Sequence, residues 1–276
     1  MVSLDLKTVF KQLNEAYAQC SPEELDDRIH EIIHHALLQY NKTDIRRASV
    51  LNELGGYYRH LFRIEESEKA FLEANEIFKL LKVENSPDYA TSINNLAGLY
   101  RISGEYEKAE KLFLQAIQIY KNTVTEEHYL YPTALSNFAL LYQDMKRYEE
   151  AAELLTHACD YFKKKPDLKS QAAYATTAAN LATVYIKMKR FNEAEALLLD
   201  SLNAYEKTLG GDAEKYGDAL NNLGSVYYEN GRYLEAKEMY GKALKICRNR
   251  LGFDNPKTVA FENNLKMTEK KIAPDN

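Results

Sequence analysis

The sequence contains few cysteines, no long apolar run and no excess of basic residues. Its three cysteines, Cys20, Cys159 and Cys247, are odd in number and far apart, which fits reduced thiols better than a disulfide framework. No stretch approaches the roughly 20 apolar residues of a membrane-spanning helix, and the N-terminus lacks the basic and apolar segments of a secretory signal. The 36 Lys and Arg residues against 41 Asp and Glu give a net charge of −5, without the basic stripe of a nucleic-acid-binding protein. These absences predict a soluble, cytoplasmic protein that binds neither membranes nor nucleic acids.

The common motifs of cofactor and nucleophile chemistry are also missing. The sequence has no glycine-rich phosphate loop, no Cys-x-x-Cys pair and no order of Ser, His and Asp that suits a nucleophile elbow. Tyrosines are abundant, but they recur at regular intervals, which is typical of packing between helices. We therefore predict no cofactor and no catalytic residue.

One motif of metal chemistry is present, because His30-Glu31-Ile32-Ile33-His34 has the spacing of the HExxH zinc site. The two histidines lie one helical turn apart, and the separation of His34 from Glu53 resembles that in gluzincin aminopeptidases, which implies Glu31 as general base and Glu53 as third ligand. Against this, the apolar stripe of the helix leaves both histidines at its border, as amphipathic packing alone would. Such zinc sites also lie beside β-strands, and this sequence is predicted to be helical almost throughout. We predict no metal site and keep a zinc-dependent peptidase as the third-ranked function.

The sequence does contain a block that returns about every 42 residues. Residues 93–100 (INNLAGLY) come back as 135–142 (LSNFALLY) and as 220–227 (LNNLGSVY). One apolar position in this block serves to align the copies: Leu54, Leu96, Phe138, Leu181, Leu223 and Leu265. A period of this length is typical of an array in which each unit buries its apolar face against its neighbours.

Each repeat is predicted to consist of two helices joined by a short turn. The apolar spacing gives five helix pairs over about 44–84, 87–127, 129–168, 171–211 and 214–254, preceded by a helical hairpin over 1–43 and followed by a capping helix and tail over 255–276. Gly104 and Gly231 stand in the turns of two pairs, where a left-handed conformation is expected. Phe62, Lys146 and Lys189 occupy that place in the other three pairs, at a cost of about 1–2 kcal/mol for a left-handed residue with a Cβ. We expect those turns to be remodelled or strained.

The order of Leu, small residue and Tyr in the first helix, then Gly in the turn, then Tyr, Ala, Phe or Tyr, and Ala in the second, resembles the tetratricopeptide repeat. The 42-residue period resembles the variety found in kinesin light chains, and the match covers about residues 44–254. This resemblance implies an all-α fold, a right-handed superhelical solenoid of antiparallel helix pairs, with a concave groove lined by the first helices.

An asparagine precedes the aligned apolar position in most repeats, off the packing stripe: Asn95, Asn137, Asn180 and Asn222, with Asn264 in the cap. Glu53 stands there in the first repeat. An amide can donate to a C=O and accept from an N–H of an extended peptide backbone. The resemblance implies this role too, because asparagines at this place hold ligand backbone in the family. The alternative is that they bond to an adjacent helix and stabilise stacking, and the two roles do not exclude each other.

Six residues further along each first helix is a second groove position, which changes from basic to apolar along the chain: Arg59, Arg101, Gln143, Ile186 and Tyr228. We predict that a ligand places acidic residues near the arginines and an apolar residue near the last two positions. The alternative is that the arginines are merely solvated.

The sequence thus predicts a non-enzymatic interaction module that binds an extended peptide or partner segment in its groove. A second reading is a regulatory protein of the same repeat type that responds to a small peptide.

Overall fold

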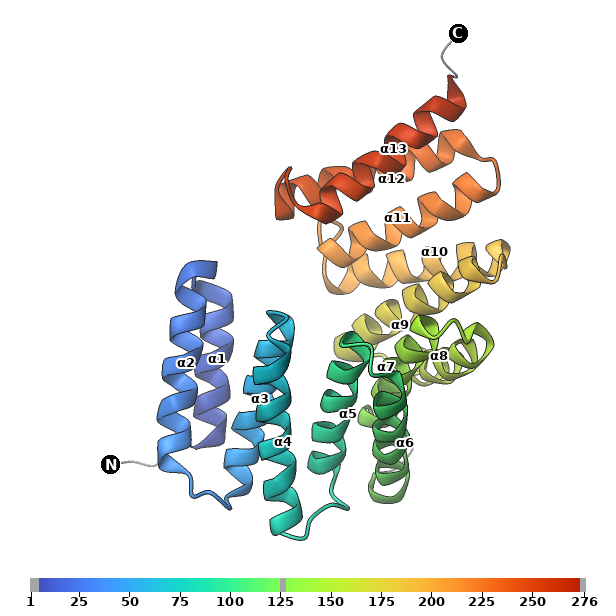
Figure 1. Ribbon diagram of the computed structural model, residues 1–276. Coiled ribbons are helices and arrows are strands. Elements are labelled where there is room, and N and C mark those ends of the chain that lie inside the picture. Colours follow the sequence, from blue (N-terminus) through green and yellow to red (C-terminus); the bar gives the residue numbers. More distant parts are fainter. Residues whose placement is uncertain (1–4, 125–127, 274–276) are drawn as a thin grey trace. The chain divides into compact units, whose positions relative to one another are not determined.

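The computed structural model describes residues 5–124 and 128–273. The ends of the predicted hairpin (1–43), of the second helix pair (87–127) and of the C-terminal cap (255–276) lie partly outside these ranges. The described residues form helices and no strand: α1 Leu6–Gln19, α2 Pro22–Gln39, α3 Ile45–His60, α4 Ile64–Leu80, α5 Pro87–Ile102, α6 Tyr106–Thr123, α7 Leu130–Asp144, α8 Tyr148–Lys163, α9 Leu168–Lys187, α10 Phe191–Thr208, α11 Glu214–Glu229, α12 Tyr233–Leu251 and α13 Pro256–Ile272. The prediction of an all-α array of helix pairs is confirmed (Figure 1).

The chain divides into two compact units, residues 1–134 and 135–276, and the division falls inside α7. In the first unit consecutive helices from α1 through α6 are in contact with each other, and α3 also contacts α5. In the second unit each helix from α8 to α13 contacts the next, and α9 also contacts α11. Within each unit, therefore, consecutive first helices lie side by side.

Local sequence explains where several helices begin. The Ser86 side chain accepts a hydrogen bond from the backbone N–H of Tyr89, and the Asn255 side chain accepts one from that of Lys257. Pro87 and Pro256 follow these caps in the first turn, where no N–H is needed. A capping side chain followed by proline thus marks the start of both α5 and α13.

The turn inside each of the five pairs has a residue with positive φ. The glycines Gly104 and Gly231 have φ of 81° and 74°. Phe62, Lys146 and Lys189 have φ of 57°, 60° and 60°, so these turns keep the left-handed conformation and are strained, not remodelled. The left-handed residue ends the first helix and allows the next backbone N–H to bond back to a carbonyl at the end of that helix. In the third pair, for example, the N–H of Arg147 donates to the C=O of Tyr142 (2.8 Å).

Close packing within a pair depends on a small residue after the aligned apolar position. A Cβ on Gly224 would lie 2.8 Å from the ring of Tyr240, and one on Gly55 would lie 2.7 Å from the ring of Phe71. The first repeat also has Ser67 where the other second helices have alanine. Its hydroxyl is fully buried and donates to the C=O of Gly55 (2.7 Å), so this departure from the repeat is satisfied internally.

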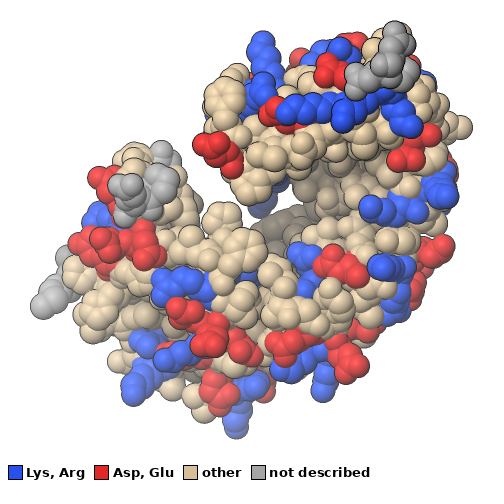
Figure 2. Space-filling view, turned by 45° about the horizontal axis from the view of Figure 1, so that its top comes forward, with Lys and Arg blue, Asp and Glu red and all other residues tan. Residues whose placement is uncertain are grey.

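The surface agrees with the even charge distribution of the sequence. In Figure 2, acidic and basic side chains are interspersed over the face in view, without one large patch of either sign. Among the described residues no helix is long and apolar enough to cross a membrane. Cys20, Cys159 and Cys247 are free thiols, and burial raises the pKa of Cys159 to about 12.

Candidate functional site

The predicted ligand-binding residues all lie on first helices and are all half-buried: Asn95, Asn137, Asn180, Asn222, Arg59, Arg101, Gln143, Ile186 and Tyr228. The contacts of α3 with α5 and of α9 with α11 bring some of them together within each unit. We refer to the residues before the aligned apolar positions as the asparagine positions, and to those six residues later as the second groove positions.

Three of the asparagines bond to the preceding first helix through one amide N–H. Asn95 donates to Oδ1 of Asn52 (3.4 Å), Asn222 to Oγ1 of Thr183 (3.3 Å) and Asn264 to Oδ1 of Asn221 (3.0 Å). These are the stacking contacts that the sequence analysis named as an alternative. Within the described residues each of the three amides leaves one N–H and its carbonyl oxygen unused, since an amide carries two donor hydrogens and an acceptor.

The other two asparagines are less engaged. In the described part of the chain, the side chains of Asn137 and Asn180 have no hydrogen-bond partner, although both are half-buried. Their amides can therefore accept and donate without first breaking a contact within the protein. Glu53 stands at the asparagine position of α3, and desolvation by the neighbouring protein atoms raises the pKa of its carboxyl group.

Two of the second groove positions donate a hydrogen bond to the backbone of the asparagine position on the next first helix, a contact that the sequence did not predict. Nη1 of Arg59 donates to the backbone C=O of Asn95 (3.1 Å), and Nε2 of Gln143 donates to that of Asn180 (3.1 Å). The equivalent offset in both bonds shows that a long polar side chain at this position links successive first helices. Ile186 lacks a donor and cannot form such a bond.

The guanidinium of Arg59 reaches α5, where it lies beside Gly98. A Cβ on Gly98 would come within 2.9 Å of its Nη1, so the glycine leaves room for the guanidinium. Burial and then the charge of Arg101 lower the pKa of Arg59, since both disfavour the cationic form. The groove of the first unit thus contains two like charges close together, and an anion placed there would relieve their repulsion.

The groove of the second unit is hollowed between α9, α11 and the start of α13. The cavity has a volume of about 480 Å³ and is lined by polar groups of successive first helices: Thr176, Asn180, Thr183, Lys215, Asp218, Asn221, Asn222 and Lys257, together with Ala179, Ala219, Tyr205 and Phe261. Lys257 bonds to Asp218 (3.1 Å) and to Glu214. Asn180 and Asn222 therefore face the same hollow, where amides and hydroxyls outnumber unpaired charges.

Aromatic side chains lie toward the end of this unit's groove. The ring of Tyr228 lies 5.3 Å from that of Tyr233 in an edge-on arrangement. Together with the half-buried Ile186, Tyr228 makes this part of the second unit less polar than the Arg59 region of the first.

A repeated arrangement at the turns was missed by the sequence analysis, and we call it the turn clamp. An arginine at the N-cap of the second helix bonds to a glutamate three residues later and lies over the ring of a tyrosine five residues earlier. Its members are Arg63 with Glu66 and Tyr58, Arg147 with Glu150 and Tyr142, Arg190 with Glu193 and Tyr185, and Arg232 with Glu235 and Tyr227. The guanidinium carbon is 4.0–4.6 Å from the ring centroid in each case. The Arg-x-x-Glu recurrence in the sequence could have revealed it.

The turn of α5 and α6 contains the same clamp with exchanged charges. Glu105 stands in place of the arginine and Lys108 in place of the glutamate, and the two form an ion pair of 2.5 Å. Lys108 lies 5.0 Å from the centroid of the Tyr100 ring. The tyrosine thus keeps a cation over its face although the sequence order is reversed.

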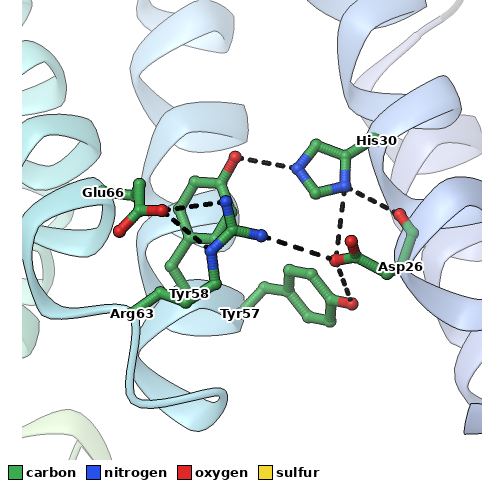
Figure 3. Close-up of polar contacts among 6 residues, drawn as sticks. All are labelled: Asp26, His30, Tyr57, Tyr58, Arg63 and Glu66. Atoms are coloured by element: carbon green, nitrogen blue, oxygen red, sulfur yellow. Dashed lines mark hydrogen bonds and ion pairs between the residues drawn. The ribbon is translucent and has the colours of Figure 1, made fainter.

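His30 of the HExxH motif belongs to a polar cluster that joins α2 to α3 (Figure 3). Nδ1 of His30 faces the backbone C=O of Asp26 (2.7 Å), and its Nε2 faces the hydroxyl of Tyr58 (2.8 Å). The Tyr57 hydroxyl donates to Oδ1 of Asp26 (2.9 Å), which also lies 3.8 Å from Arg63. Both ring nitrogens of His30 thus have partners. The described residues include no group of three His, Cys, Asp or Glu placed to hold a metal ion, so the zinc alternative lacks its ligand geometry.

Comparisons with known proteins agree with this architecture. A family model for the tetratricopeptide repeat matches residues 46–122, 93–164 and 174–249. A kinesin-light-chain-like protein of Podospora anserina with nearly identical TPR-like repeats superposes with a TM-score of 0.62 at 22% identity, covering 76% of this chain and 98% of the other. The apo quorum sensor NprR of B. thuringiensis superposes with a TM-score of 0.69 at 14% identity, covering 99% and 73%.

The similarity to a curated protein is confined to a short segment. A nucleotide-binding leucine-rich repeat (NLR)-like protein of Hyaloscypha variabilis is 40% identical over 50 residues, which are 18% of this chain and 5% of that protein. The predicted resemblance to kinesin-light-chain-like repeats is confirmed by the family model and the structural neighbours.

Proposed function

Because the chain belongs to the tetratricopeptide repeat family, whose members typically act as protein-interaction scaffolds, we propose that it is a non-enzymatic module that binds an extended peptide or partner segment along its first helices. The observation that carries this proposal is the hollow of the second unit, in which Asn180 and Asn222 face the same cavity with unused hydrogen-bonding capacity.

The spacing of the asparagine positions suits an extended ligand. Neighbouring helices pack at roughly 8–10 Å and an extended strand rises roughly 3.3 Å per residue, so successive amides meet about every third ligand residue. An amide with one N–H and its carbonyl oxygen still available can bond to both polar groups of the ligand backbone without contacting the ligand side chains. The asparagines would therefore supply affinity, and the second groove positions would supply sequence preference.

The second groove positions favour an acidic residue at one end of the ligand and an apolar residue at the other. Arg59 is half-buried beside Arg101, and four of its five N–H donors are left after the bond to Asn95. A ligand carboxylate would form charge-assisted bonds there, which are about twice as strong as neutral ones. Ile186 and Tyr228 would contact an apolar side chain.

The test is capture of partners by the immobilised chain from a cell extract. The Asn180→Ala, Asn222→Ala double variant is compared with wild type and with Asn192→Ala, a matched change at an exposed asparagine of α10. We expect the double variant alone to lose a set of partners while its circular dichroism spectrum stays helical. If every partner survives the double change, the asparagines do not bind ligand.

A peptide array tests the charge preference separately. Acidic peptides should bind more strongly than their amidated counterparts, and this difference should shrink in Arg59→Gln. Equal binding of acidic and neutral peptides to wild type would contradict the role of the arginines. The regulatory alternative stays a prediction, and a ligand-dependent change in the scattering radius would distinguish it from a rigid scaffold.

A further inference from the structure

A second cavity lies in the last helix pair, away from the groove. It has a volume of about 560 Å³ and is lined by α11, α12 and the loop before α11: Gly211, Asp212, Tyr216, Leu220, Lys242, Lys245, Ile246, Asn249 and Arg250. Tyr216 and Leu220 each lie two residues from the groove residue Asp218, which places them roughly 200° around the helix from it at about 100° per residue. The cavity therefore opens on the opposite side of α11 from the proposed peptide groove.

The preceding helix pair shows what the same position contains when it is closed. The hydroxyl of Tyr174 donates to Oδ2 of Asp200 (3.1 Å), and Nζ of Lys163 lies 3.3 Å from the same oxygen. Tyr174 is only 5% exposed. A carboxylate is thus held between a tyrosine hydroxyl and a lysine, and the tyrosine is buried.

The last pair keeps the tyrosine but reverses the charge of its partner. Tyr216 and Lys242 occur 42 residues after Tyr174 and Asp200. Lys242 cannot accept a hydrogen bond and instead pairs with Glu238 (2.6 Å). Tyr216 is half-exposed, and its hydroxyl has no partner in the described part of the chain. The last pair therefore keeps the tyrosine hydroxyl but has a lysine where the preceding pair has the carboxylate of Asp200.

The remaining walls make the cavity basic at its rim and apolar at its floor. Its acidic residue, Asp212, is held by Arg250 through both its backbone C=O (3.1 Å) and its carboxylate. The Lys245 ammonium has no partner within the described residues. Leu220 and Ile246 form the floor, where Gly217 lets the two helices approach closely.

We propose that this cavity binds a small apolar monocarboxylate. The ligand carboxylate takes the place that the Asp200 side chain has in the preceding pair, accepting from Tyr216 and lying near Lys242 and Lys245. Its apolar body lies on Leu220 and Ile246. The volume is within the roughly 300–1,000 Å³ of small-molecule sites. This site is independent of the peptide groove.

The test is titration of the full chain with sodium octanoate, with 1-octanol as the uncharged probe, followed by calorimetry and by NMR of the tyrosine rings. Lys242→Asp should recreate the closed arrangement of the preceding pair, because the new carboxylate accepts from Tyr216, and should weaken octanoate binding at least tenfold. Lys111→Asp, the same charge change on α6, is the matched control and should leave binding unchanged. Tyr216→Phe should weaken binding several-fold, whereas Tyr174→Phe should not.

Three results would overturn the proposal. They are no octanoate binding at millimolar concentration, equal binding of octanol and octanoate, or equal loss in the Lys242→Asp and Lys111→Asp variants. Since neither variant alters the groove, partner capture should be unaffected by both.

Discussion

The turns and the groove of the same helix pairs differ in how their residues vary from one repeat to the next. In each turn clamp a cation and an anion three residues apart form an ion pair with each other. This holds even in the turn where Glu105 and Lys108 have exchanged signs. The asparagine positions keep an asparagine from α5 to α13, with Glu53 in α3, and among the described residues these amides leave much of their hydrogen-bonding capacity unused. The charged residues of a turn can therefore exchange as a pair, while the asparagine positions from α5 to α13 keep their side chain although its partners within the protein change.

The changing partners of the asparagines illustrate this. Asn95 and Asn264 bond to Asn52 and Asn221, which occupy equivalent places on the preceding helix. Ala179 stands at that place on α9 and cannot accept, so Asn222 bonds instead to Thr183. Asn222 thus keeps a contact with the preceding first helix although the acceptor has changed, so the stacking role of these asparagines does not depend on one fixed partner.

The largest effect on stability is expected where the two helices of a pair pack closely against each other, between the turns and the groove. Gly224→Ala places a methyl group 2.8 Å from the buried ring of Tyr240 and should lower the free energy of unfolding by about 1–3 kcal/mol. Gly241→Ala, in the same pair but with open space around the new Cβ, should raise it by up to about 1 kcal/mol. Urea denaturation of both variants measures the difference. Equal effects would show that close approach at Gly224 does not limit the fold.

In the strained turns, replacing a residue that has a Cβ by glycine should raise the free energy of unfolding. Lys189 is left-handed with φ of 60°, so Lys189→Gly should remove about 1–2 kcal/mol of strain, partly offset by the greater freedom of glycine in the unfolded chain. The net expected gain is about 0.5–1 kcal/mol. Gly231→Lys, at the equivalent turn with φ of 74°, should cost a similar amount. A stabilising Gly231→Lys change would contradict the strain argument.

The sequence predicted these turns better than it predicted side-chain contacts. The repeat alignment located the helix pairs and the left-handed positions, because each depends on local backbone chemistry that recurs with the period. It missed the bond from Arg59 to the backbone of Asn95, which joins residues 36 apart. It also missed the clamps, because the exchanged pair Glu105 and Lys108 breaks the pattern in one repeat.

The exchanged clamp suggests a smaller but sharper experiment. Arg190→Glu leaves two glutamates, at 190 and 193, beside each other and removes the cation over Tyr185, so thermal stability should fall. Adding Glu193→Lys recreates the order found at Glu105 and Lys108 and should restore most of the loss. A double-mutant cycle by thermal denaturation measures the coupling. If the second change does not rescue the first, the two versions of the clamp are not equivalent.

The smallest effect on stability is expected in the groove. The amide of Asn180 has no partner in the described part of the chain, so Asn180→Ala should change the free energy of unfolding by less than about 0.5 kcal/mol. Asn222→Ala loses a 3.3 Å bond to Thr183 and should cost somewhat more, up to about 1 kcal/mol. Urea denaturation measures both, with Asn192→Ala as the exposed reference. A loss of several kcal/mol in Asn180→Ala would mean that the asparagines stabilise the stack, and partner loss in the groove variant would then reflect the fold and not the ligand.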